Sequence, residues 1–103
     1  MAHAARAGLL TWLIGMAGSA MAMTPLTTLQ QAASQCFANP SAARCDGVWD
    51  LSAQLKQQAE KNEQLGCYSS LLALEAMVSM ARLGSQDHAQ QTKALQTTSR
   101  ECP

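Results

Sequence analysis

The segment from Cys67 to Leu83, CYSSLLALEAMVSMARL, carries the strongest structural signal in the chain. It contains no glycine or proline, and its large apolar residues spread around more than half of a helical circumference: Leu71, Leu72, Leu74, Met77, Val78, Met80 and Leu83. A helix that is apolar nearly all round is usually buried. The segment therefore predicts a helix in the middle of a helical bundle, ended by Gly84.

A first and a fourth helix are expected on either side of this region. Thr24 is a typical capping residue, and Pro25 suits the first helical position because its missing N–H has no partner there in any case. Asn39-Pro40 should end that helix. Ser85 or Asp87 can begin the fourth helix, which has few apolar residues and is expected to be the least stable.

A second helix should run from about Ser41 or Asp46 to Gln64, with Gly66 as its C-terminal cap. In these segments the apolar residues recur at intervals of three and four rather than two, which is typical of amphipathic helices. We therefore predict an all-α fold, a small disulfide-stapled bundle of about four helices that form two helical hairpins.

An export signal precedes the helical region. Arg6 lies before a core of roughly 10 apolar residues, and Ala20-Met21-Ala22 has the A-x-A pattern of a signal peptidase site. A spanning helix needs about 20 apolar residues, so this core is too short, and retention as a membrane anchor is the less favoured alternative. We expect residues 1–22 to be a signal peptide cleaved after Ala22, and residues 23–103 to be a single helical domain. The expected protein is periplasmic or secreted and has no stable membrane insertion after cleavage.

Four cysteines, Cys36, Cys45, Cys67 and Cys102, follow the export signal. In an oxidising compartment they predict two disulfides. A helix over residues 46–65 is about 30 Å long, whereas a disulfide needs Cα atoms within about 7 Å, so neither Cys36 nor Cys45 can reach Cys67. The expected pairs are Cys36–Cys45 and Cys67–Cys102, each across one turn. The C-x-x-C spacing of redox proteins and closely spaced zinc ligands are both missing.

Charge and motifs exclude several classes of function. The chain has seven basic and seven acidic residues, and loss of Arg6 leaves a net charge of about −1, which does not favour nucleic acid or anionic lipid. We expect no catalytic, cofactor-binding or metal-binding residues. His88 is the single histidine of the expected mature chain, and the serines lack a G-x-S-x-G context. Met77 and Met80 could hold Cu(I), but core packing is the favoured interpretation.

Three aromatic residues are the candidate interface residues: Phe37, Trp49 and Tyr68. Trp49 lies at the edge of the apolar stripe of the second helix. Together with Phe37 it is expected to cover the Cys36–Cys45 disulfide. If Trp49 is instead exposed, it would be an interface anchor.

The spacing of the four cysteines in an exported helical domain resembles that of small periplasmic immunity proteins of bacterial secretion systems. In those proteins a cysteine followed by a glycine and an aromatic residue opens a helix, a pattern that Cys45-Asp46-Gly47-Val48-Trp49 matches in part. Tyr68 stands where they have a proline beside the third cysteine, so we do not assign the chain to that family.

Size, stapling and the missing catalytic groups favour a non-catalytic protein-interaction or accessory factor, whose partner is another protein. The alternative is a small extracytoplasmic lipid- or metal-binding carrier, although saposin-like lipid binders usually have six cysteines. A hydrolytic enzyme is the third and least favoured reading of the chain.

Overall fold

The computed structural model describes residues 24–103, so the expected signal peptide and its cleavage site lie outside the described residues. Four helices follow one another: α2 (Pro25–Ala38), α3 (Ala42–Lys61), α4 (Leu65–Arg82) and α5 (His88–Glu101). They make up 82% of residues 24–103, in which no strand occurs. The predicted all-α bundle of about four helices is confirmed.

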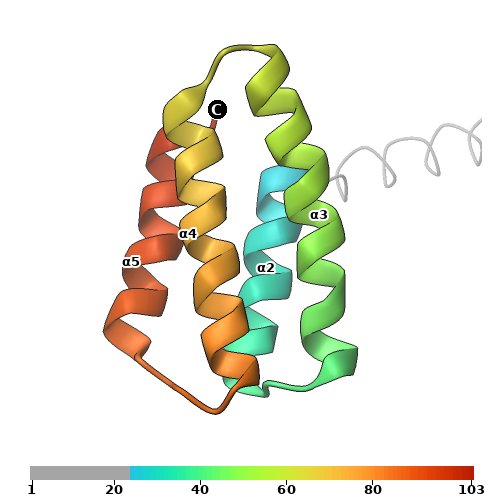
Figure 1. The fold of residues 1–103 in the computed structure, drawn as a ribbon, viewed down its shortest axis with the longest axis vertical. Helices are drawn as coiled ribbons and strands as arrows, with labels where there is room; N and C mark the ends of the chain where they lie inside the picture. The colour runs from blue at the N-terminus through green and yellow to red at the C-terminus, as the bar shows by residue number, and fades with distance from the viewer. Residues whose placement is uncertain (1–23) are drawn as a thin grey trace, which may run out of the picture.

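The helices run alternately up and down, so that α2 with α3 and α4 with α5 form the two expected hairpins (Figure 1). α2 and α4 each pack against the other three helices, whereas α3 and α5 do not contact each other. α3 and α5 therefore occupy opposite corners of the bundle. α4 lies between them and packs on α2 with the face that points into the bundle.

The core is built from buried residues spaced three and four apart on every helix, as in other antiparallel four-helix bundles. On α4 these residues are Cys67, Ser70, Leu71, Leu74, Val78 and Ala81. α5 supplies mainly small or polar side chains, namely Gln91, Ala94 and Thr98. This agrees with the expectation that the last helix has few apolar residues.

Both disulfides belong to this core and have the predicted pairing. Cys36–Cys45 joins α2 to α3 with Cα atoms 4.7 Å apart, and Cys67–Cys102 joins the start of α4 to the end of α5 with Cα atoms 4.6 Å apart. Each bond closes one hairpin. No disulfide connects the two hairpins, which are joined only by the backbone turn between α3 and α4.

The helix boundaries confirm the predicted N-terminal caps. The side-chain oxygens of Thr24, Ser41 and Asp87 accept hydrogen bonds from the backbone N–H groups three residues later, at the starts of α2, α3 and α5. Of the two starts considered for the second helix, the structure has Ser41. Of the two considered for the last helix, it has Asp87.

The predicted cap at Gly66 was wrong, because Gly66 lies inside the first turn of α4. α3 ends earlier, and Glu63 takes the left-handed conformation there with φ 58°. Its N–H donates to the Glu60 carbonyl, and the N–H of Gln64 donates to the Ala59 carbonyl at 2.7 Å, which together form a Schellman motif. Gly84, with φ 90°, ends α4 by the same pattern of hydrogen bonds, as predicted.

The expectation that α4 is buried all round was also wrong. Leu72 and Met80 are each 45% exposed, and Leu83, just after the helix, is 84% exposed. A bundle of four helices covers only the inward face of each one. α4 therefore has one apolar face in the core and a second apolar face in solvent.

Candidate interaction surface

The outward face of α4 is an apolar strip that runs the length of the helix. We call it the α4 stripe and define it by the exposed residues Leu65, Ser69, Leu72, Ala76, Ser79, Met80 and Leu83. At 100° per residue these positions fall within one third of the helical circumference, directly opposite the buried residues. Leu65 is 75% exposed, so large apolar side chains stand in solvent at both ends and in the middle.

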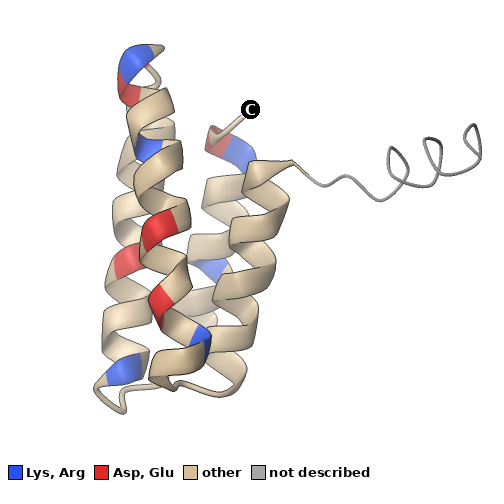
Figure 2. Cartoon of the chain, turned by 90° about the vertical axis from the view of Figure 1, so that its right-hand side faces the viewer, with Lys and Arg blue, Asp and Glu red and all other residues tan. Residues whose placement is uncertain are grey.

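No charged residue belongs to the α4 stripe, and the charges beside it are paired. Glu75, on the side of α4 that faces α3, forms a salt bridge with Lys56, with 3.0 Å between Lys56 Nζ and Glu75 Oε2. Arg82 donates to Asp46 at 2.7 Å. Figure 2 shows the charged residues scattered along the helices, with most of the ribbon uncharged. Depletion of charge at an exposed apolar surface is typical of the centre of a protein–protein interface.

The three aromatic residues predicted as interface candidates do not share one surface. Phe37 is only 6% exposed and belongs to the core, and Trp49 packs partly buried against the same core. Tyr68 is partly buried near the start of α4, with Lys56 Nζ 6.0 Å from its ring centroid. Since α3 and α4 are antiparallel, Trp49 near the start of α3 and Tyr68 lie toward opposite ends of that helix pair.

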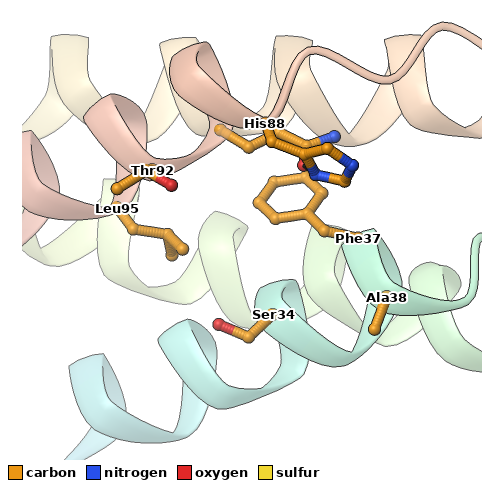
Figure 3. A pocket seen from close by; sticks show the side chains of 7 residues that line it. Ser34, Phe37, Ala38, His88, Thr92 and Leu95 are labelled. Carbon is orange, nitrogen blue, oxygen red and sulfur yellow. Dashed lines mark hydrogen bonds between the residues drawn. The ribbon is translucent and has the colours of Figure 1, made fainter.

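A shallow cavity of about 320 Å³ lies between α2 and α5, lined by Ser34, Phe37, Ala38, His88, Gln91, Thr92 and Leu95. His88 and Phe37 both line this space, and Thr92 and Leu95 point toward it from α5 (Figure 3). His88 Nδ1 is 3.2 Å from Gln91 Oε1, and Gln91 in turn donates to Gln86 Oε1 at 2.7 Å. These bonds fix the imidazole and the amides in a structural network.

Among residues 24–103, no serine is hydrogen-bonded to a histidine or carboxylate side chain, although Ser34 lines the same α2–α5 cavity as His88. His88 is the one titratable residue that lines the α2–α5 cavity. Ser70 is buried and donates to the Cys67 carbonyl at 2.8 Å, whereas Ser69 and Ser79 are exposed on α4, away from that cavity. A hydrolytic site would need a serine and a base within hydrogen-bonding reach, and no such pair occurs in residues 24–103.

The two methionines considered as copper ligands both lie on α4. Met77 packs against the core, whereas Met80 is part of the α4 stripe. They border a cavity of about 200 Å³ together with Ser85, Asp87, Gln90 and Gln91. Residues 24–103 contain no cluster of three or more His, Cys, Asp or Glu side chains that could hold a metal ion. None of the four described helices combines the length and the hydropathy that crossing a membrane requires.

Comparison of the chain with protein-family models, with curated proteins and with solved structures found no match. The functional argument therefore depends on the geometry of the chain itself. In that geometry the α4 stripe stands out, and sequence reasoning assigned three of its large residues, Leu72, Met80 and Leu83, to a buried helix. One feature of the sequence could have distinguished the exposed residues from the core residues: the apolar residues of this helix form two sets on opposite faces.

Proposed function

We propose that this protein is an exported, non-catalytic interaction or accessory factor that binds another protein through the α4 stripe. The observation that supports the proposal is the exposure of Leu65, Leu72, Met80 and Leu83 along one uncharged helix face. Exposed apolar residues of this size, aligned rather than scattered, are favourable to bury against a partner.

The scaffold supports the same proposal because it holds this face rigid. α4 is fixed by α3 and α5 on its two sides and by Cys67–Cys102 at its start. A surface that is already ordered loses little conformational entropy when it binds, so more of the burial energy contributes to affinity. A helix face of this kind suits recognition of another helix.

The proposed location is the periplasm or the extracellular space. The two disulfides fit an oxidising compartment, in which such bonds form and persist. The A-x-A sequence Ala20-Met21-Ala22 after an apolar core supports export by signal peptide cleavage. A stapled domain of this size can remain folded there without a large core.

The test is capture of a partner with the mature protein immobilised, from an extracytoplasmic extract of its own host. Leu72→Glu should abolish capture, since it places a charge in the middle of the α4 stripe. Gln96→Glu is the matched control because it adds the same charge on the exposed face of α5, outside the stripe.

Equal capture by the wild type and Leu72→Glu would contradict the proposal. A copurifying lipid or copper ion in native mass spectrometry would instead favour the carrier alternative. In that case the α4 stripe would not be the functional surface.

A further inference from the structure

We infer that the Cys67–Cys102 disulfide is a redox switch: a dithiol reductant opens this bond before it opens Cys36–Cys45, and the opening releases α5 from the bundle. The inference goes beyond the proposed function and does not depend on it, because the α4 stripe takes no part in the switch. Its basis is the difference in burial between the two disulfides and the way in which α5 is attached to the other helices.

The two disulfides differ in their exposure to solvent. Cys36 and Cys45 are 0% exposed, whereas Cys67 is 3% exposed and Cys102 is 6% exposed. These fractions are small, so a reductant reaches either bond when a helix moves away from its neighbours. The bond that is reduced first is therefore the one whose helices separate at the lower free energy.

α5 separates at low free energy because a cavity lies on each of its two sides. The α2–α5 cavity has a volume of about 320 Å³, and Leu95 borders it. The second cavity, of about 200 Å³, lies between α4 and α5, where Met77 and Gln90 border it. Gln91 borders both cavities. Side chains that line empty space lose dispersion contacts there, so the first half of α5 is weakly held.

The second half of α5 has few attachments besides the disulfide. The amide of Gln30 donates to the Leu95 carbonyl from α2 at 3.3 Å. The Glu101 carboxylate lies against Gly66 at the start of α4, where it fills the place that a Cβ would take. Water can replace a polar contact of this kind when the helices part, so each contributes little net stability. Cys67–Cys102 is therefore the main attachment of this half.

The helices joined by Cys36–Cys45 are held more firmly. Leu29 on α2 and Val48 on α3 are fully buried, as are the two cysteines themselves. Separation of α2 from α3 brings these apolar side chains into water, which is unfavourable in proportion to the area exposed. Local opening therefore gives a reductant access to Cys67–Cys102 before Cys36–Cys45.

The positions of the two sulfurs determine the course of the reduction. Cys67 lies in the first turn of α4, where the helix dipole stabilises a thiolate and no side chain caps the helix. Cys102 lies at the C-terminal end of α5, where the dipole has the opposite sign. A stabilised thiolate is the better leaving group. The thiolate of the reductant therefore attacks Cys102 Sγ, and the electron pair of the broken S–S bond goes to Cys67 Sγ.

The second thiol of the reductant completes the exchange. It attacks the reductant's own sulfur in the mixed disulfide, so that the bond to Cys102 breaks and the reductant becomes an internal disulfide. The reductant gives up two electrons and two protons, and Cys67 and Cys102 become thiols. Release of α5 then uncovers the sides of α2 and α4 on which Phe37 and Met77 border the two cavities.

The experiment is reduction of the mature, oxidised protein by dithiothreitol without denaturant, with alkylation by iodoacetamide at intervals and peptide mapping. Cys67 and Cys102 should be alkylated at least about tenfold faster than Cys36 and Cys45. Hydrogen exchange of the form with two free thiols should show α5 unprotected and α2 and α3 still protected.

Two results would overturn the inference. One is alkylation of all four cysteines together, or of Cys36 and Cys45 first. The other is a form with free Cys67 and Cys102 thiols in which α5 stays as protected as in the oxidised protein. Glutathione, a monothiol, tests the direction of attack, because the mixed disulfide it forms should lie on Cys102. A mixed disulfide mainly on Cys67 overturns that direction.

A matched pair of variants tests whether α5 opens locally. Leu95→Ala and Leu55→Ala remove the same atoms from partly buried positions on α5 and α3. Leu95→Ala should accelerate alkylation of Cys67 several-fold, since it weakens the packing of α5, whereas Leu55→Ala should leave the rate near that of the wild type. Equal acceleration by both would show that the bond opens only when the whole bundle unfolds, which overturns the switch. If either variant fails to fold, the order of alkylation in the wild type still decides.

Discussion

Two single residues end α3 and α4 in the left-handed backbone conformation. At Gly84 this conformation has no steric cost, because glycine lacks a Cβ. At Glu63 the same conformation brings the Cβ close to the neighbouring carbonyl, which destabilises a non-glycine residue by about 1–2 kcal/mol. The two turns therefore have the same hydrogen bonds but a different backbone energy.

We expect substitutions at these two turns to have opposite signs. Gly84→Ala should lower the free energy of unfolding by about 1 kcal/mol, and Glu63→Gly should raise it by several tenths to about 1 kcal/mol. Gly47→Ala is the control, since Gly47 lies within α3 with open space around it, and it should stabilise by about 0.5–1 kcal/mol. Urea denaturation measures all three. Loss of stability in Glu63→Gly would show that the end of α3 differs from the structure.

Two leucines on α4 allow its inward and outward faces to be compared, because Leu74 lies on the first and Leu72 on the second. Leu74 is fully buried, so Leu74→Ala should lower the free energy of unfolding by about 2–5 kcal/mol through lost contacts and a residual cavity. Leu72→Ala is the matched change on the exposed face and should lower it by less than about 1 kcal/mol. Urea denaturation compares the two variants. Similar losses would mean that α4 is rotated relative to its observed position.

At the scale of the elements, α5 depends on covalent attachment more than the other helices do. Its buried side chains Gln91, Ala94 and Thr98 contribute little apolar area. The Thr98 hydroxyl donates to the Ala94 carbonyl at 2.8 Å, within the helix itself. The amide of Gln30 reaches across from α2 to the Leu95 carbonyl at 3.3 Å. Cys102 therefore supplies the strongest attachment of α5 to the bundle.

Removal of the two disulfides should have unequal effects. Cys67–Cys102 spans 35 residues and Cys36–Cys45 spans 9. Loop-closure entropy predicts a loss of about 3.8 kcal/mol for the longer loop and about 2.6 kcal/mol for the shorter one. The variants Cys67→Ser/Cys102→Ser and Cys36→Ser/Cys45→Ser can be compared by thermal denaturation.

Hydrogen exchange provides a second measurement on the same two variants. Loss of Cys67–Cys102 should increase amide exchange in α5 before it affects α3, because α3 has no contact with α5. Loss of Cys36–Cys45 should leave α5 protected. Equal exchange throughout both variants would show that the bundle opens as one unit and that α5 is not separately weak.

At the scale of the whole molecule, each disulfide lies within one hairpin, so the two hairpins are held against each other by core packing and by the short α3–α4 turn of the backbone. Leu29 from α2, Val48 from α3 and Leu74 from α4 are fully buried in the shared core. The fully buried Ser52 hydroxyl has no hydrogen-bond partner, which is unfavourable for the bundle. This small core explains why the domain benefits from two disulfides.

Export is the prediction that belongs to the complete chain. Cleavage after Ala22 should leave Met23 as the first residue of the extracytoplasmic protein, because the apolar core and the A-x-A pattern match signal peptidase substrates. Intact mass spectrometry of the protein from its native host, without reduction, should show this N-terminus and four oxidised cysteines. A full-length species in the membrane fraction would refute cleavage and support the retained anchor.

The sequence by itself determined the features that depend on local rules. Apolar spacing of three and four residues predicted helices. Thr24 predicted where α2 begins, and the start of α5 was narrowed to Ser85 or Asp87, of which the structure has Asp87. The disulfide pairing also followed, because the length of one helix keeps Cys45 and Cys67 apart. These inferences needed only the geometry of a helix and of a covalent bond.

The tertiary structure alone decided which face of α4 is buried and where α3 ends. Leu72 and Leu74 have the same hydrophobicity, and only the positions of the other three helices place Leu74 in the core and Leu72 in solvent. α3 ends at a turn that has no glycine, because packing of the α3–α4 hairpin holds Glu63 in a conformation that its local sequence does not favour. Burial and strain of this kind depend on neighbours distant in sequence, so the α4 stripe could be recognised only after the bundle was assembled.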